Sequence, residues 1–342
     1  MLRNFGIILR GFEVKFSTKA QKVSDLLPND DISTKLLKVA VIGMPNAGKS
    51  TFINNLMDRK VCPTSNKVHT TRAKSRAIFT EADSQIVFLD TPGLVNLKEQ
   101  KKYNLEKTFL RDSKSSLHDA DVVGVIHDAS NVWTRDKLDI KVIRLLENHK
   151  SKPSFLVFNK VDVIRSKRKL LDLTRLLTEN CIDGKPIPGG KSLRNEDNNI
   201  RGWPHFQEIF MVSALTGSGL AEVKNYLIRN AKPAKWMFPS EIWSDQTAEA
   251  IIVNSVKAKL LDFLPQEIPY NLRAELEFFN INDKGVVSTV VLVHCPSQRV
   301  AKLVAGVSDG KLRQITESLQ HDLQETFQNY VRIKLVLEGP KE

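Results

Sequence analysis

The feature that most constrains this fold is residues 39–52, which read VAVIGMPNAGKSTF. Apolar, β-prone residues run directly into Gly43, and the pattern GxxxxGKS then extends to Ser50. A buried strand, a glycine-bearing turn and the start of a helix together direct backbone N–H groups and the positive end of the helix dipole at phosphate groups. The stretch is therefore predicted to be a phosphate-binding loop, in preference to an ordinary glycine turn.

The residues of this loop have separate predicted roles. Lys49 can reach the β and γ phosphates, and the Ser50 hydroxyl, in the first helical turn, is placed to ligate Mg²⁺. Asn46 could hold K⁺ against the same phosphates and so supply positive charge in the transition state, or it could only brace the loop. The predicted nucleotide-binding residues here are Gly43, Pro45, Asn46, Ala47, Gly48, Lys49, Ser50 and Thr51.

Two later segments are predicted to respond to the γ-phosphate. Residues 62–76 are polar and without hydrophobic period, so they are predicted to be a mobile switch loop. In it Thr71, with Thr70 as the reserve, gives its hydroxyl to Mg²⁺ and its N–H to the γ-phosphate. An ordinary Ser/Thr-rich loop is the alternative. The predicted catalytic residues are Asn46, Lys49 and Thr71.

The second of these segments follows a predicted strand pair at residues 77–79 and 86–89, which ends in the sequence DTPG. Asp90 is placed to hold Mg²⁺ through a water, so the predicted metal ligands are Ser50, Thr71 and Asp90. Gly93 can offer its N–H to the γ-phosphate because no Cβ blocks a close approach. Residues 97–107 are predicted to form the second switch. Leu94, directly after this motif, cannot orient an attacking water, so hydrolysis is expected to be slow.

Two further strand ends are predicted to recognise the base. Apolar runs at 122–127 and 154–158 predict buried parallel strands, and the second delivers the sequence NKVD to the carboxyl edge of the sheet. Asp162 can accept hydrogen bonds from N1–H and the 2-amino group of guanine, a donor pair that adenine lacks, while the Lys160 stem lies along the ring. After a strand at 208–212, the Ala214 N–H can meet the guanine carbonyl oxygen. The residues assigned to the base are Asn159, Lys160, Asp162, Ser213, Ala214 and Leu215, and the predicted ligands are GTP and GDP.

The chain of 342 residues is long enough for two domains, and its charge is uneven. Residues 232–342 carry 13 Lys+Arg against 14 Asp+Glu, which leaves 38 against 25, or +13, on residues 1–231. A basic surplus of this kind indicates contact with nucleic acid. The cysteines are scattered and odd in number (Cys62, Cys181 and Cys295), so they predict neither a disulfide framework nor a metal cluster. No apolar run approaches the ~20 residues needed to cross a bilayer.

The N-terminus is predicted to be a targeting segment. Residues 1–24 alternate basic and apolar side chains, with Glu13 the only acid, which is typical of a mitochondrial transit peptide. A disordered basic tail is the alternative.

The C-terminal part is predicted to follow a linker at residues 232–245. Hydrophobic spacing then predicts a helix at 247–263, strands at 272–279 and 286–294, helices at 299–305 and 311–328, and a strand at 331–338. This α-β-β-α-α-β order resembles a KH domain of the second type.

Taken together, the motifs resemble an Era-like GTPase of the mitochondrial form. The resemblance rests on GMPNAGKS, the TTR of the first switch, DTPG, NKVD, SAL and the EIPY of the C-terminal part. It implies an α/β fold: a Ras-like P-loop GTPase domain at 37–231 and a smaller α+β KH domain at 246–342. It also implies GTP hydrolysis that is slow, depends on Mg²⁺ and is stimulated by K⁺. The protein is expected to bind small-subunit ribosomal RNA and to assist assembly of the mitochondrial small ribosomal subunit. It is expected to do so as a monomer in the mitochondrial matrix. Peripheral membrane contact is left open.

One motif departs from the family pattern. A KH domain clamps nucleotide phosphates with GxxG, whereas here Gly306 is the first glycine and Asp309 occupies the place of the second. Gly310 could serve if the turn is one residue longer. The predicted RNA-binding residues are Lys302, Gly306, Gly310, Lys311 and Arg313. The alternatives are a domain that packs but binds RNA weakly and, for the whole chain, a nucleotide-gated protein-binding scaffold with negligible turnover.

The stretch between Asp162 and Ser213 is longer than the motifs require. Residues 165–179 predict a helix whose basic face, RSKRK, is more often solvated than a binding site. Residues 181–204 predict an insertion loop without an assigned role.

Overall fold

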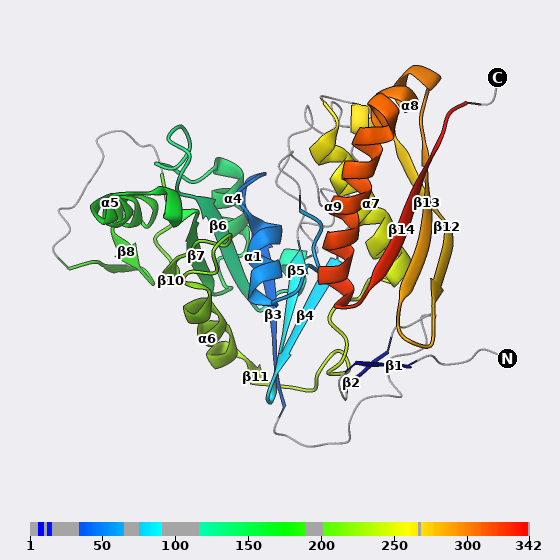
Figure 1. The fold of residues 1–342 in the computed structure, drawn as a ribbon. Helices are drawn as coiled ribbons and strands as arrows, with labels where there is room; N and C mark the ends of the chain where they lie inside the picture. Colours follow the sequence, from blue (N-terminus) through cyan, green and yellow to red (C-terminus); the bar gives the residue numbers. More distant parts are fainter. Residues whose placement is uncertain are drawn as a thin grey trace.

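The structure, a computed structural model, describes residues 34–64, 75–90, 116–188, 201–265 and 268–340. Near the N-terminus it also describes the backbone of two antiparallel strands, β1 (Gly6–Leu9) and β2 (Phe12–Lys15). The rest of the predicted transit peptide at 1–24 lies outside the described residues. Figure 1 shows a mixed sheet with helices on both faces, followed by a smaller unit of helices packed on a second sheet. This second sheet has the three strands β12 (Arg273–Ile281), β13 (Val287–His294) and β14 (Val331–Glu338). The arrangement of the two units is the predicted fold class.

A sheet of mostly parallel strands forms the larger part. Its order is β10-β7-β6-β3-β5-β4, and only β4 runs antiparallel to its neighbour along this path. Parallel strands of this kind are buried on both faces, which explains their nearly continuous apolar runs. The strands are β3 (Lys35–Ile42), β4 (Ser75–Glu81), β5 (Ser84–Asp90), β6 (Val122–Asp128), β7 (Ser154–Asn159) and β10 (Phe206–Met211).

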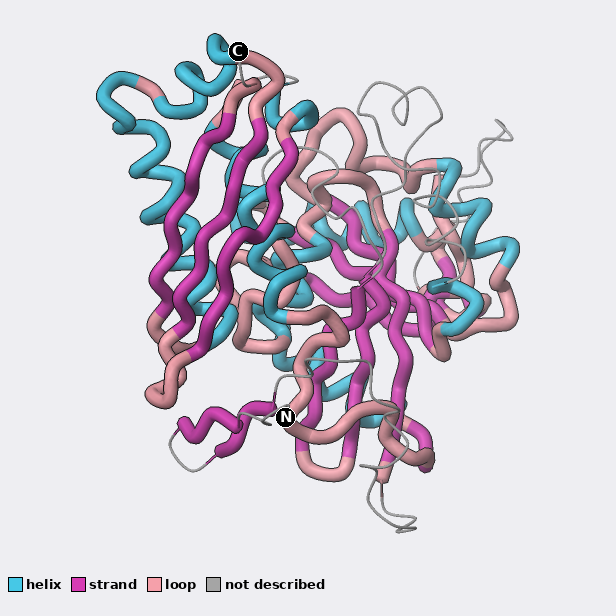
Figure 2. The backbone as a smooth tube through the Cα atoms, turned by 90° about the vertical axis from the view of Figure 1, so that its right-hand side faces the viewer, coloured by secondary structure: helices cyan, strands magenta, loops and turns pink. Residues whose placement is uncertain are grey.

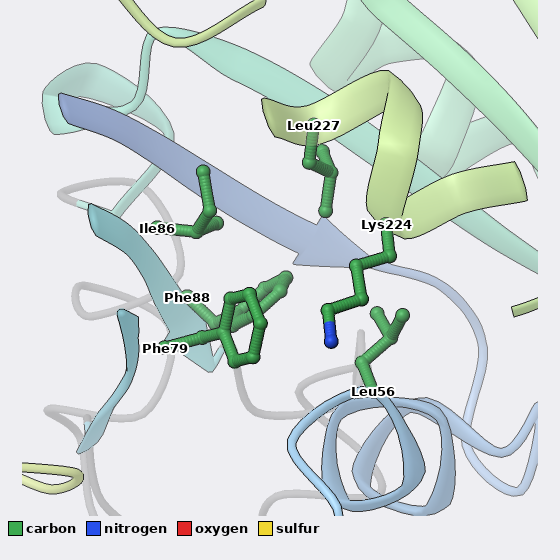
Figure 3. A pocket seen from close by; sticks show the side chains of 6 residues that line it. All are labelled: Leu56, Phe79, Ile86, Phe88, Lys224 and Leu227. Carbon is green, nitrogen blue, oxygen red and sulfur yellow. The ribbon is translucent and has the colours of Figure 1, made fainter. Parts of the chain in front are cut away.

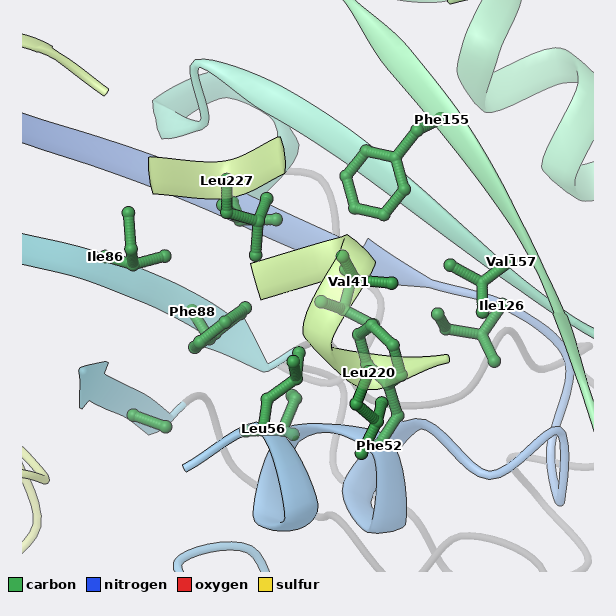
Figure 4. Packing of buried hydrophobic residues seen from close by; sticks show 14 of the residues in the cluster. Val41, Phe52, Leu56, Ile86, Phe88, Ile126, Phe155, Val157, Leu220 and Leu227 are labelled. Carbon is green, nitrogen blue, oxygen red and sulfur yellow. The ribbon is translucent and has the colours of Figure 1, made fainter. Parts of the chain in front are cut away.

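Two hydrophobic clusters lie on the two faces of this sheet. Strand β3 contributes Val39 and Val41 to one cluster and Ala40 and Ile42 to the other, because successive side chains of a strand point to opposite faces. The first cluster includes α1 (Lys49–Leu56) and α6 (Leu220–Asn230), whose packing Figure 4 shows. The second includes α4 (Ile140–Asn148) and α5 (Lys167–Leu177).

Sequence patterns did not predict every element. Helices α4 and α6 were missed, although Val142, Ile143 and Leu146 have helical spacing and are buried. Residues 75 and 76, placed in the first switch, belong to β4, and helix α5 is shorter than the predicted 165–179. The predicted insertion loop contains a small hairpin, β8 (Cys181–Ile182) and β9 (Lys185–Pro186). Tertiary packing decides such short elements more strongly than local propensity does.

A small apolar cavity lies beneath α6. Figure 3 shows Leu56, Phe79, Ile86, Phe88, Lys224 and Leu227 around it. The Lys224 ammonium lies 4.4 Å from the Phe79 ring centroid and 2.7 Å from a carboxylate oxygen of Glu81. This lysine therefore covers the cavity with its stem while its charge is paired.

The C-terminal unit has the predicted α-β-β-α-α-β order. Strands β12 and β13 are antiparallel, β14 adds to β13 in parallel, and the helices pack against this sheet through a third hydrophobic cluster (Figure 2). The elements are α7 (Ala248–Phe263), β12 (Arg273–Ile281), β13 (Val287–His294), α8 (Gln298–Ala305), α9 (Gly310–Phe327) and β14 (Val331–Glu338). No helix among the described residues is both long and apolar enough for a membrane span.

The predicted linker follows the larger sheet closely. It begins as β11 (Lys232–Pro233), which pairs with the start of β3. The buried Gln85 side chain then donates to the Phe238 carbonyl at 2.8 Å and accepts from the N–H groups of Met237 and Phe238 at 2.9 and 3.1 Å. The Ile78 N–H donates to the Trp243 carbonyl at 3.0 Å. These bonds fix the path of the chain between the two sheets.

Side chains that follow α1 contact α9 directly. The Lys60 ammonium lies 2.6 Å from Asp322, and the Arg59 guanidinium donates to the Thr326 carbonyl at 3.2 Å and lies 4.9 Å from the Trp243 ring. Burial lowers the pKa of Arg59 to about 10. The segment that follows the phosphate-loop helix is thus joined to the C-terminal unit and the linker by charged and aromatic contacts.

Candidate functional site

The phosphate loop has a shape that only glycine permits at two positions. Gly43 has φ +156°, and a Cβ there would lie 2.4 Å from the Ile126 carbonyl oxygen. Gly48 has φ +91°, and a Cβ there would lie 2.2 Å from the side-chain nitrogen of Asn159. The loop can therefore approach β6 and β7 closely because these residues lack side chains.

Two lysines hold the carbonyls of the loop. Lys49, which is mostly buried, donates from Nζ to the carbonyls of Gly43 and Met44 at 3.1 and 3.0 Å. Lys160 donates to the Asn46 carbonyl at 2.9 Å. Asn46 itself is exposed and has φ +61°, a conformation that asparagine tolerates better than most residues. Pro45 and Ala47 complete the turn, and Ser50 and Thr51 lie in the first turn of α1.

Asn159 connects three of the predicted motifs. Its side chain is 2% exposed and donates to the Ala47 carbonyl at 2.8 Å. Its Oδ1 accepts from the N–H groups of Ala214 and Lys160 at 2.9 and 2.8 Å. The described side chain therefore braces the phosphate loop against the two loops assigned to the base.

This bracing changes one prediction. The Ala214 N–H, expected to meet the guanine oxygen, donates to Asn159 in this structure. Ser213 is buried and accepts from the Thr216 N–H at 3.3 Å, whereas Leu215 is 79% exposed. The SAL motif thus lies at the expected strand end, but its central N–H is engaged within the protein.

An ion pair that motif reasoning missed lies beside these loops. Lys160 has φ +63°, and its Nζ is 2.6 Å from a carboxylate oxygen of Asp128 at the end of β6. Burial alone would raise the pKa of Asp128, but hydrogen bonds from Lys160 and Ser130 outweigh it and hold this pKa below its ordinary value. The aspartate therefore stays ionised and fixes the direction of the lysine. Its only sequence signal was a position at a strand end.

The remaining predicted residues are only partly described. Asp162 is exposed in a short 3-10 turn directly after β7. The backbone of Asp90 ends β5 opposite Val41 of β3, close to the start of the phosphate loop. Thr71, Gly93 and the second switch at 97–107 lie outside the described residues. An aspartate at that strand end and the Ser50 hydroxyl in α1 would offer the oxygen ligands that Mg²⁺ prefers.

The structure thus brings the predicted motifs to one edge of the sheet. The strands β3, β5 and β7 end there, and each is followed by its motif. The carboxyl edge of such a sheet is where ligands bind in open α/β folds. A glycine-bearing loop at the start of a helix, on this edge of the sheet, suits a phosphate-bearing ligand.

Comparisons with known proteins by sequence and by structure agree with one another. The sequence model of the family described as "50S ribosome-binding GTPase" matches residues 38–160. "GTPase Era, mitochondrial" from Danio rerio is 35% identical over 93% of this chain and 78% of its own length, and the same-named protein from Salmo salar is 34% identical over 90% and 77%. The crystal structure of Era in complex with MgGDPNP and nucleotides 1506–1542 of 16S ribosomal RNA matches 90% of this chain and 94% of that one, at 23% identity and a TM-score of 0.70.

Proposed function

This chain belongs to the Era family of GTPases, and from that premise we propose that it binds small-subunit ribosomal RNA and assists assembly of the mitochondrial small ribosomal subunit. The names of the two fish relatives support a mitochondrial location, and we place the protein in the matrix as a monomer. The similar Era structure that contains 16S ribosomal RNA supports an RNA partner. The observation that carries the proposal is a C-terminal α-β-β-α-α-β unit held against the segment that directly follows the phosphate-loop helix.

The chain is a GTPase, and we assign its nucleotide contacts to the edge described above. Lys49 would release the two loop carbonyls to contact the β and γ phosphates. Ser50, Asp90 and Thr71 would hold Mg²⁺, which neutralises phosphate charge when bound. The backbone of Gly93 would receive the γ-phosphate. Lys160 and Asp162 would bind guanine, with Asn159 positioning both loops.

Replacing Asp162 by asparagine should weaken GTP binding by about 1–3 kcal/mol, because a donor would face the 2-amino group of guanine. The same change should improve binding of xanthosine triphosphate, which has a carbonyl at that position. Competition titrations with the two nucleotides measure both effects. Asp172, an exposed aspartate on α5, gives the matched control variant Asp172→Asn, which should bind GTP normally. Equal competition by ATP and GTP in the unsubstituted protein would contradict the assignment.

Hydrolysis should be faster in KCl than in NaCl, by about tenfold, if Asn46 holds K⁺ against the phosphates. Asn46→Ala should remove the difference between the salts. Because Asn46 has φ +61°, alanine also strains the backbone, and Asn46→Gly removes the side chain without that strain. Both variants should therefore behave alike in single-turnover assays. Equal rates in the two salts, unchanged in either variant, would mean that Asn46 only braces the loop.

The RNA contact is proposed at the turn between α8 and α9. Gly306 has φ +75° and ψ −173°, a region that essentially only glycine occupies. Gly310 has ordinary helical angles, and the left-handed residues of the turn are Ser308 and Asp309, at φ +46° and +57°. Asp309 is exposed and does not cap α9 with its side chain. The Gly306 and Gly310 N–H groups donate to the carbonyls of Lys302 and Val307. The proposed phosphate contacts are therefore the other N–H groups of the turn, with Lys302, Lys311 and Arg313.

Crosslinking in mitochondria followed by RNA sequencing tests the function. Enrichment of small-subunit ribosomal RNA, increased by a non-hydrolysable GTP analogue, is the expected result. The alternative result is recovery of protein partners alone, with no more RNA than is recovered with a crosslinked control GTPase. That result would instead support the nucleotide-gated scaffold. The Lys49→Ala variant should show no response to the analogue.

A further inference from the structure

An exposed tryptophan lies in the loop that follows β6, beside the basic helix α5. We propose that this surface is a second RNA contact, in which an unstacked base of single-stranded RNA lies on the Trp133 indole and its phosphates meet the start of α5. The inference rests on the proposed RNA-binding function and places a contact outside the C-terminal unit.

The indole of Trp133 has no structural role among the described residues. Its side chain is 91% exposed, and Val132 and Ile140 nearby are 62% and 53% exposed. No hydrogen bond or ring contact of this indole occurs within the described part of the chain. Trp203, by contrast, is buried, and Trp243 contacts Phe327 and Arg59. A large aromatic surface left in water is a feature of binding sites more than of the fold itself.

Hydrogen bonds hold the loop around Trp133 in place. The Asn131 side chain accepts from the Trp133 N–H at 3.1 Å, and the Asn131 carbonyl accepts from the Arg135 N–H at 2.9 Å. A ring nitrogen of His127 lies 2.9 Å from the Arg135 carbonyl. Because these bonds hold the backbone around Trp133, the loop loses little conformational freedom when it binds a ligand.

The loop at 129–138 runs beside α5. At one end Asp128 is paired with Lys160, seven residues before α5 begins. At the other end the Leu138 N–H donates to the Arg201 carbonyl at 2.8 Å, and Arg201 in turn donates to Glu179, just after α5 ends. Leu138 also packs in the same hydrophobic cluster as Leu170 and Leu173 of α5. The loop is therefore attached to the segments on both sides of this helix.

The charge of this region suits a polyanion. Residues 129–188 contain 13 Lys+Arg against 7 Asp+Glu, a net +6, whereas residues 232–342 have a net −1. Arg165, Lys167 and Arg168 are exposed around the start of α5. The first turn of α5 has no acidic residue, and its cations oppose the helix dipole, so helix stability does not explain them. Bound phosphates would offset this repulsion.

A flat aromatic side chain beside cations is the arrangement that proteins use to bind single strands. Every base has a face that can stack on an indole, so such a contact tolerates many sequences. The cations follow the backbone and make the affinity depend on salt. An acidic protein surface could also pack on an indole. Each nucleotide of a single strand, however, carries both a base for an aromatic face and a phosphate for a cation. The combination of the indole with the cations around the start of α5 therefore favours RNA.

Anisotropy titration of the full chain with a labelled oligo(A) of about 12 nucleotides tests the stacking. Trp133→Ala should weaken binding about 5- to 150-fold, and Trp133→Phe, which keeps an aromatic face, should lose less. Phe278→Ala, at an exposed aromatic of β12, is the matched control and should bind normally. RNA should also quench the fluorescence of Trp133, which is measured as the difference in emission between the wild-type protein and Trp133→Phe. All variants should keep the wild-type unfolding midpoint and GTP hydrolysis.

The salt dependence tests the charge contribution. For Arg165→Gln/Arg168→Gln, the slope of log K against log salt should become shallower by about 1.4, the value for two lost phosphate contacts on a single strand. The double variant Lys150→Gln/Lys232→Gln alters two exposed lysines near the amino ends of β7 and β3. It should leave the slope unchanged.

The outcomes separate this inference from the proposed function. If Gly306→Asp abolishes oligo(A) binding and Trp133→Ala does not weaken it, the chain binds RNA and the second contact is refuted. If the unsubstituted protein binds neither oligo(A) nor small-subunit ribosomal RNA, the proposed function fails as well. Loss of a protein crosslink in Trp133→Ala, with unchanged RNA affinity, would refute the inference in favour of an acidic protein partner.

Discussion

Replacing Asn159 by alanine should lower the free energy of unfolding by about 3 kcal/mol and weaken GTP binding at least about tenfold. The side chain is buried and makes hydrogen bonds to Ala47, Lys160 and Ala214. Alanine would leave these backbone groups without their partner in a site closed to water, and each such buried group costs about 1–3 kcal/mol. The loops would also lose the brace that fixes them around the nucleotide.

The matched control for this variant is Gln85→Ala. Gln85 is equally buried and also makes three hydrogen bonds to backbone groups, but it holds the linker far from the phosphate loop. Denaturant unfolding should show similar losses of stability in the two variants, whereas calorimetric titration should show weakened GTP binding only in Asn159→Ala. Equal GTP affinity in both would mean that Asn159 stabilises the fold without positioning the nucleotide loops.

Replacing Gly306 by aspartate should reduce RNA affinity by about a hundredfold or more at fixed low salt. Its φ and ψ lie in a region that other residues occupy only under strain of about 1–3 kcal/mol. A Cβ there would also lie 2.7 Å from the Lys311 Cβ. The substitution therefore displaces the start of α9 and adds a negative charge where the backbone is proposed to meet phosphate.

Two companion variants separate charge from backbone strain. Gly306→Ala imposes the strain without the charge, so it should weaken RNA binding less than Gly306→Asp. Asp309→Gly removes a charge from a left-handed residue, and it should tighten binding by about 1 kcal/mol or less in physiological salt. Each is checked by RNA titration at one salt concentration and by thermal unfolding. Wild-type RNA affinity in a folded Gly306→Asp protein would place the main contact elsewhere, and the basic surface around Trp133 would be the first region to test.

The sequence by itself determined the fold class and the order of the motifs along the strands. The phosphate loop, NKVD and SAL are short stretches whose chemistry depends on residues a few positions apart. The apolar runs of β6 and β7 and the helical spacing of α7 and α9 are likewise local signals. Such features can be predicted because the period of a strand or helix and the conformational needs of a turn are set by neighbouring residues.

Only the tertiary structure decided which groups these motifs contact. The amide of Asn159 bonds to residues 112 and 55 positions away, and this pairing engages the Ala214 N–H that was assigned to guanine. The structure also placed the left-handed residues of the turn at Ser308 and Asp309 and gave Gly310 helical angles. It bonded the linker to the sheet and left Trp133 exposed beside α5. These outcomes depend on which distant segments pack together and which backbone groups remain to be paired, and no local pattern encodes that competition.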